Sequence, residues 1–129
     1  MKKLKKAIAL ILCLALLAFC SNSALAVNVY KNIYGGSTYT VATGNRTSDY
    51  IVVTIHSNSN FYGTTEGINF RAYLGTDKYS NAMTFRSGDV PGYKQRDYFG
   101  TAQGMLMAKS NLTTSSSSVY VTFAGVVSF

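Results

Sequence analysis

The sequence predicts an all-β protein, an antiparallel β-sandwich of seven or eight short strands that follows an N-terminal signal peptide. Three observations predict this fold. After residue 26, β-branched and aromatic residues dominate, with ten Val, thirteen Thr and ten Tyr against three Leu and one Glu. Apolar residues recur at every second position in several segments. Clusters of Gly, Asn and Ser separate these segments, as turns do between strands.

The first 26 residues have the organisation of a secretory signal peptide. Four lysines among the first six residues precede an apolar stretch from Ala7 to Cys20, and Ala24-Leu25-Ala26 supplies small residues for cleavage. The apolar stretch is shorter than the roughly 20 residues that a membrane-spanning helix needs. We therefore expect residues 1–26 to be removed, and residues 27–129 to be secreted as a single domain without a transmembrane anchor.

Three strands are predicted most clearly by their alternation. Ile51–Ile55 and Ile68–Leu74 each place apolar side chains at every second position. The C-terminal segment does the same over a longer stretch, and we expect Gly125 within it to mark a bulge or a close approach of two backbones. The residues expected to face the core from this last segment are Val119, Val121, Phe123, Gly125, Val127 and Phe129.

Five further segments are weaker strand candidates, and turn signals such as Gly35-Gly36, Gly75-Thr76-Asp77 and Gly88 to Gly92 separate them. The serine-rich run Thr113–Ser118 predicts a hairpin loop before the last strand. The five candidates are Val27–Ile33, Ser37–Thr43, Met83–Ser87, Gln95–Thr101 and Gly104–Lys109.

The secreted segment has few residues that could carry out catalysis or bind metal. Both cysteines leave with the signal peptide, and one histidine remains. His56 falls on the strand face opposite Ile51, Val53 and Ile55, where a surface role is expected, and no Gly-x-Ser-x-Gly motif supports a hydrolase triad. The five carboxylates lie in or beside turns and predict no catalytic pair. We expect no enzyme activity, no cofactor and no metal site, although a small hydrolase that uses His56 is kept as an alternative.

Tyrosine is the most unusual feature of the composition. Tyr combines a large, rigid contact area with a polar tip, which is why it is enriched at binding interfaces. Tyr62, Tyr79 and Tyr93 fall in predicted loops, and Lys94 and Arg96 follow Tyr93 directly. We therefore predict a binding site made of Tyr62, Tyr79, Tyr93, Lys94 and Arg96.

The charge pattern favours some partners over others. With eight basic and five acidic residues, the secreted segment has a formal charge of +3, and it contains no run of like charges typical of a nucleic-acid-binding tail. A mild positive charge suits attraction to an anionic surface. We expect a secreted, non-enzymatic protein that binds a bacterial cell-wall component or another protein at the cell envelope, and not nucleic acid. A second hypothesis is a self-assembling matrix or surface-layer protein, in which the C-terminal strand is a free edge that pairs with a neighbouring copy.

The organisation of the chain resembles that of small secreted proteins of Gram-positive bacteria, namely the lactococcin-972-like bacteriocins and related uncharacterised Bacillus-type proteins. The resemblance lies in the Lys-rich signal ending in Ala24-Leu25-Ala26 and in a cysteine-free mature chain rich in Tyr, Ser, Thr, Asn and Gly. It includes the segments Asp49–Thr54, Arg71–Gly75 and Val119–Phe123. It implies a β-sandwich that acts as a bacteriocin-like antagonist of cell-wall synthesis in neighbouring bacteria, and it assigns no individual site residue.

Overall fold

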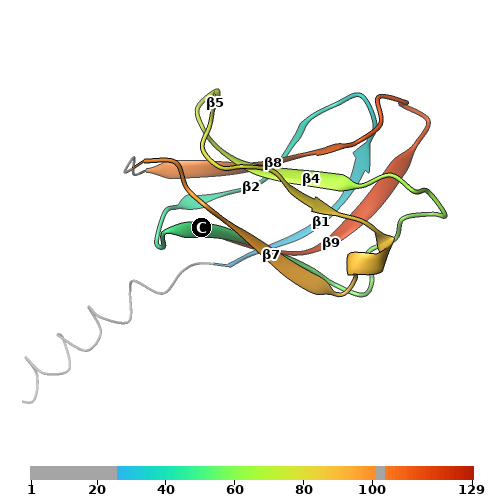
Figure 1. The fold of residues 1–129 in the computed structure, drawn as a ribbon, viewed down its shortest axis with the longest axis horizontal. Helices are drawn as coiled ribbons and strands as arrows, with labels where there is room; N and C mark the ends of the chain where they lie inside the picture. Colours follow the sequence, from blue (N-terminus) through green and yellow to red (C-terminus); the bar gives the residue numbers. More distant parts are fainter. Residues whose placement is uncertain (1–25, 101–103) are drawn as a thin grey trace, which may run out of the picture.

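The computed structural model describes residues 26–100 and 104–129, and it confirms the predicted all-β sandwich (Figure 1). Two antiparallel sheets pack face to face, and a 3-10 helix, η1 (Ser87–Asp89), precedes β7. The first sheet contains, in spatial order, β1 (Val27–Tyr34), β9 (Tyr120–Ser128), β3 (Tyr50–Ile55) and β7 (Gly92–Asp97). The second contains β2 (Tyr39–Asn45), β8 (Met105–Leu112), β4 (Ile68–Leu74) and β5 (Asp77–Lys78), and β6 (Met83–Phe85) also pairs with β4.

The predicted signal peptide, residues 1–26, lies outside the described residues apart from Ala26. Within the described ranges, none of the helical structure has the length and apolar character that crossing a membrane requires.

The core between the two sheets is built from the predicted alternation. Ile51, Val53 and Ile55 of β3 and Ile68, Phe70 and Ala72 of β4 are fully buried, and Leu74 at the end of β4 is partly buried, which confirms the inward faces expected for these strands. The ring centroid of Phe70 in β4 lies 4.7 Å from that of Phe123 in β9 and 5.8 Å from that of Phe85 in β6. Burying an apolar side chain of this size contributes roughly 2–3 kcal/mol to stability, so these contacts hold the two sheets together.

The C-terminal strand lies inside the first sheet, so the prediction that it is a free edge is wrong. β9 pairs with β1 from Val27↔Val127 to Tyr34↔Tyr120, and Figure 1 shows the blue β1 beside the red β9. On its other side it pairs with β3, and the isolated bridge between Asn60 and Thr122 continues that contact. Five consecutive residues of β9 are buried, which is typical of a strand covered on both faces. Pairing of β9 with a second copy would require it to leave the sheet.

Gly125 marks the close approach that the sequence predicts. A Cβ atom added to this residue would lie 2.0 Å from the carbonyl oxygen of Thr54 and 2.8 Å from the ring of Phe123. Any side chain here would therefore separate β9 from β3 or displace a core aromatic ring.

Other predictions differ from the structure in the ends and connections of strands. Asp77, which belongs to the predicted turn Gly75-Thr76-Asp77, and Lys78 pair with Leu74 and Tyr73 and form the short β5, so the described strands number nine. β7 begins at Gly92 instead of Gln95, and β8 extends beyond Lys109 to Leu112. The run Thr113–Ser118 connects β8 of the second sheet with β9 of the first, so it crosses between sheets and does not close a hairpin.

The segment around the end of β7 links the two sheets at one side of the sandwich. The amide of Tyr98 donates a hydrogen bond of 3.1 Å to the carbonyl of Asp49, which precedes β3. The next amide, of Phe99, donates one of 2.8 Å to the carbonyl of Tyr79, which follows β5. Main-chain hydrogen bonds therefore connect this segment to both sheets.

Ser110→Ala should raise the free energy of unfolding by about 1 kcal/mol. Ser110 on the inward face of β8 is fully buried, and its Oγ has no hydrogen-bond partner among the described residues. Ser80→Ala is the matched control, because Ser80 Oγ accepts from the Ala72 amide at 2.9 Å and donates to the Asn81 carbonyl at 3.1 Å. We expect this control to lower stability by roughly 1–2 kcal/mol. Chemical denaturation measures both, and a destabilised Ser110→Ala variant would contradict the assignment.

The protein should lose stability at alkaline pH because of Tyr98. Burial raises the pKa of Tyr98 from 10.0 to about 12, against an opposing effect of Arg46, whose guanidinium carbon lies 4.9 Å from the centroid of the Tyr98 ring. Below about pH 10 the phenol is protonated in both the folded and the unfolded state and does not change the free energy of unfolding. Between about pH 10 and about pH 12 it ionises in the unfolded state first, so the free energy of unfolding falls as the pH rises. Tyr98→Phe should make that fall shallower in denaturation curves recorded over this range. An unchanged slope would show that other groups cause the loss.

Candidate functional site

The outward side of the first sheet is rich in tyrosine. Directly paired residues of antiparallel strands point to the same side, so the register puts Tyr34 beside Tyr120, Tyr30 beside Ala124, and Tyr93 beside Thr54 on this outward side. Tyr30 and Tyr93 are 72% and 70% exposed, so much of each ring is available for contact. We call this surface the tyrosine face and define it by Tyr30, Tyr34, Tyr50, Tyr62, Tyr93 and Tyr120.

The tyrosine face is almost uncharged. The described strands β1, β9 and β3 carry no Lys, Arg, Asp or Glu on this side, and Asp97, paired with Tyr50, adds the one carboxylate at the end of β7. Asn28 and Asn32 lie exposed between the tyrosines, and Thr54 and Val126 are partly buried there. Thr122 and Ala124, which also point to this side from β9, are buried. The surface therefore offers aromatic rings and neutral hydrogen-bonding groups, and little net charge.

Three of these rings form a cluster at one end of the face. The ring centroids of Tyr34 and Tyr120 lie 5.1 Å apart with an angle of 30° between the planes, and those of Tyr62 and Tyr120 lie 4.7 Å apart at 44°. Thr122 Oγ1 donates to Asn32 Oδ1 at 2.7 Å, so the contact of 3.1 Å between the Tyr62 hydroxyl and Thr122 Oγ1 has Tyr62 as its donor. The neighbouring Tyr62 phenol disfavours a second negative charge and raises the pKa of Tyr120 above its usual value.

The backbone holds the Tyr62 ring in this cluster at a conformational cost. Tyr62 has φ +47°, the only positive φ of a non-glycine residue in the described ranges, and such a conformation costs about 1–2 kcal/mol for a residue with a Cβ. Its amide donates to Asn60 Oδ1 at 2.8 Å, which fixes the turn. A hollow of about 230 Å³ opens beside the ring, and Gly63, Thr64, Ser118 and Tyr120 contribute to its walls. Backbone strain of this kind gathers at binding and catalytic sites.

The structure brings two of the five predicted site residues, Tyr62 and Tyr93, to the tyrosine face. Tyr79 lies elsewhere, partly buried after β5, with its ring centroid 6.4 Å from that of Tyr98. Lys94 and Arg96 leave β7 on the side opposite to Tyr93, because they pair with Val53 and Ile51, which face inward. The five residues therefore do not form one continuous surface.

Lys94 is held by interactions within the fold. Its ammonium donates to the Thr84 carbonyl at 2.6 Å, lies 3.4 Å from Asp89 Oδ2, and sits 5.3 Å from the centroid of the Phe85 ring. The backbone amide of Arg86 donates to the same carboxylate and, together with Lys94, lowers the pKa of Asp89. Lys94 therefore connects β7 to β6.

Arg96 is exposed, and the hydrogen bond that its guanidinium donates goes to the carbonyl of the preceding Gln95 at 2.8 Å. His56 is also exposed, at the end of β3. In the part of the chain that the structure describes, no group of three His, Cys, Asp or Glu side chains could hold a metal ion.

The binding site predicted from the sequence omits Tyr30 and Tyr34, although the alternation of residues in β1 indicates their position. Val27, Val29 and Ile33 alternate with Tyr30 and Tyr34, and the structure turns the first set inward and the second outward. Following that alternation through β1 would have placed both tyrosines on one face.

At position 62, glycine should give a more stable protein than alanine by about 1 kcal/mol, the reverse of the usual order. Both Tyr62→Gly and Tyr62→Ala lose the ring and its hydroxyl, but only alanine keeps a Cβ in the left-handed backbone conformation. Thermal or chemical denaturation of the two variants makes the comparison. An alanine variant more stable than the glycine variant would show that the turn does not impose a positive φ.

No protein-family model, no curated protein and no solved structure matches this chain.

Proposed function

We propose that this protein is a secreted, non-enzymatic binding protein that contacts glycan chains of a bacterial cell envelope through its tyrosine face. The observation that carries the proposal is the gathering of exposed tyrosine rings on a sheet surface that is nearly free of charge. The predicted signal peptide supports a role outside the cytoplasm.

The chemistry of the face suits a neutral, hydroxyl-rich ligand. The apolar side of a sugar ring can stack on an aromatic ring, and its hydroxyl groups need hydrogen-bond donors and acceptors nearby. Tyr30 and Tyr93 supply the most exposed rings, on the outer strands β1 and β7. Asn28 and Asn32 on β1 are exposed and add amide groups beside these rings. A polyanionic ligand would find no cation on β1, β9 or β3 of this face.

The tyrosine cluster provides a pre-formed end to this surface. Tyr120 contacts both Tyr34 and Tyr62 before any ligand binds, and the Tyr62 hydroxyl is hydrogen-bonded to Thr122. A site whose side chains are already ordered loses less conformational entropy on binding. A protein that covers glycan chains on a neighbouring cell would interfere with the synthesis of that cell's wall. The same surface would therefore support a bacteriocin-like antagonist.

Replacing Tyr30 and Tyr93 together by alanine should weaken binding to isolated cell walls about tenfold, because two ring contacts of about 0.5–1.5 kcal/mol each are lost. The full chain is expressed, the protein is purified from the culture medium, and binding is measured by sedimentation with walls of several Gram-positive species. Phe99→Ala is the matched control, since Phe99 is an exposed aromatic residue (46%) that lies outside the tyrosine face.

The same protein preparations distinguish an antagonist from an adhesion protein. Clearing of bacterial lawns by the wild-type protein, and its loss in the double variant, would support an antagonist. Wall binding without clearing would support adhesion. Absence of wall binding, or equal binding by the double variant and the wild type, would refute a glycan-binding role of the tyrosine face.

A further inference from the structure

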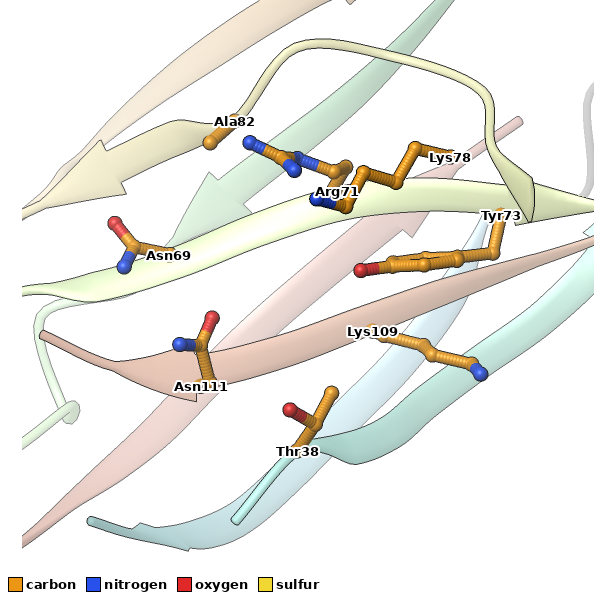
Figure 2. A pocket seen from close by; sticks show the side chains of 8 residues that line it. All are labelled: Thr38, Asn69, Arg71, Tyr73, Lys78, Ala82, Lys109 and Asn111. Atoms are coloured by element: carbon orange, nitrogen blue, oxygen red, sulfur yellow. The ribbon is translucent and has the colours of Figure 1, made fainter. Parts of the chain in front are cut away.

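The outward side of the second sheet carries a hollow whose chemistry is opposite to that of the tyrosine face. Its volume is about 290 Å³. Figure 2 shows the side chains around it, which come from separate parts of the chain that β4, β5 and β8 bring together. The residues that matter here are Asn69, Arg71, Tyr73, Lys78, Lys109 and Asn111.

Three of these residues are cationic, and no carboxylate lines the hollow. Asp77, the neighbour of Lys78 in the sequence, pairs with Leu74 and leaves β5 on the other side of the strand. Within the described ranges, no salt bridge is formed by Arg71, Lys78 or Lys109. The hollow therefore concentrates positive charge in a protein whose mature formal charge is only +3.

The register makes this concentration costly to the fold. Arg71 on β4 and Lys109 on β8 are direct cross-strand partners, and like charges in that position are destabilising. Lys109 Nζ lies 4.7 Å from the centroid of the Tyr73 ring, and this cation–π attraction offsets part of the repulsion. Figure 2 shows Arg71 and Lys78 on one side of the Tyr73 ring and Lys109 on the other. An anion in the hollow would relieve the repulsion.

Neutral polar groups lie beside the cations. Asn69 and Asn111 are also cross-strand partners, next to the Arg71 and Lys109 pair. Asn69 Oδ1 accepts from Thr84 Oγ1 at 2.6 Å, which leaves its amide hydrogens as donors. Asn111 Nδ2 donates to the Leu112 carbonyl at 3.2 Å, which leaves its Oδ1 as an acceptor. The hollow can therefore recognise hydroxyl groups as well as negative charge.

We propose that this hollow binds one phosphorylated sugar or polyol unit, with Arg71 and Lys78 on the phosphate and Asn69 and Asn111 on the hydroxyl groups. Lys109, on the other side of the Tyr73 ring, adds positive charge to the site without touching the phosphate. The volume of the hollow accommodates a single small unit and is at the lower end of the range for ligand sites. Guanidinium and ammonium groups commonly hold a phosphate by charge-assisted hydrogen bonds. The site is on the other side of the sandwich from the tyrosine face and does not depend on the function proposed for it.

Glucose 6-phosphate is the probe, with glucose and inorganic phosphate as comparisons, added to the isotope-labelled protein in nuclear magnetic resonance titrations at low ionic strength. We expect glucose 6-phosphate to shift the amide signals of β4, β5 and β8 and to bind more tightly than inorganic phosphate, and glucose alone to bind much more weakly. Arg71→Gln and Lys78→Gln should each weaken binding about tenfold. Arg96→Gln, which removes the same charge from an exposed site on β7, should leave binding within twofold of wild type.

Thermal denaturation provides a second measurement that is independent of the titrations. Lys109→Gln removes the repulsion across β4 and β8, so its Tm without ligand should equal or exceed that of the wild type, and glucose 6-phosphate should raise the wild-type Tm more than that of this variant. Absence of shifts in β4, β5 and β8, or equal weakening by Arg96→Gln and Arg71→Gln, would overturn the proposal. Because these variants leave the tyrosine face intact, wall binding through that face can fail or succeed separately.

Discussion

The central position of β9 in the first sheet is the constraint on which the other features of this molecule depend. β9 gives its hydrogen bonds to β1 on one side and to β3 on the other, and Gly125 allows it to approach the Thr54 carbonyl where a side chain would not fit. A slip of one residue in either ladder would exchange the inward and outward faces of a whole strand. The register of β9 therefore decides that Phe123 enters the core and that Tyr34 and Tyr120 meet on the outer surface.

The two outer surfaces of the sandwich differ in chemistry although they share one core. On the first sheet the outward positions carry tyrosine, asparagine and threonine, and the polar contacts of Tyr62 and Thr122 stabilise the cluster without charge. On the second sheet the outward positions of β4, β5 and β8 carry Arg71, Lys78 and Lys109. The mild positive charge of residues 27–129 is therefore not spread evenly, and the two faces suit ligands of different charge.

The fold could be predicted from the sequence to the extent that it depends on local alternation. Ile51–Ile55 and Ile68–Leu74 show their inward faces directly, and the core contacts of these strands follow. The neighbours of a strand depend on pairing between distant segments, which alternation does not report. For that reason alternation predicts neither the interior position of β9 nor the short β5, whose Asp77 belongs to a predicted turn.

The same distinction explains what could be predicted of the candidate site. Tyr62 and Tyr93 are recognisable as exposed aromatics, but adjacency in sequence is misleading within a strand, where Tyr93 and Lys94 point to opposite sides. Arg71 and Lys109 become neighbours only through the pairing of β4 with β8, so no local pattern marks their hollow. The strain at Tyr62 is a property of backbone angles and has no signature in composition.

The pairing of β1 with β9 has a consequence for the time at which the protein can fold. Val27 pairs with Val127, so the first sheet needs segments from both ends of the described chain and cannot be complete before residue 127 has been synthesised. Contacts between such distant segments also make folding slow, because the loop must close before the contacts form. The second sheet does not contain β9, so its strands can pair earlier than those of the first sheet, and the sandwich is closed only after β9 has been made.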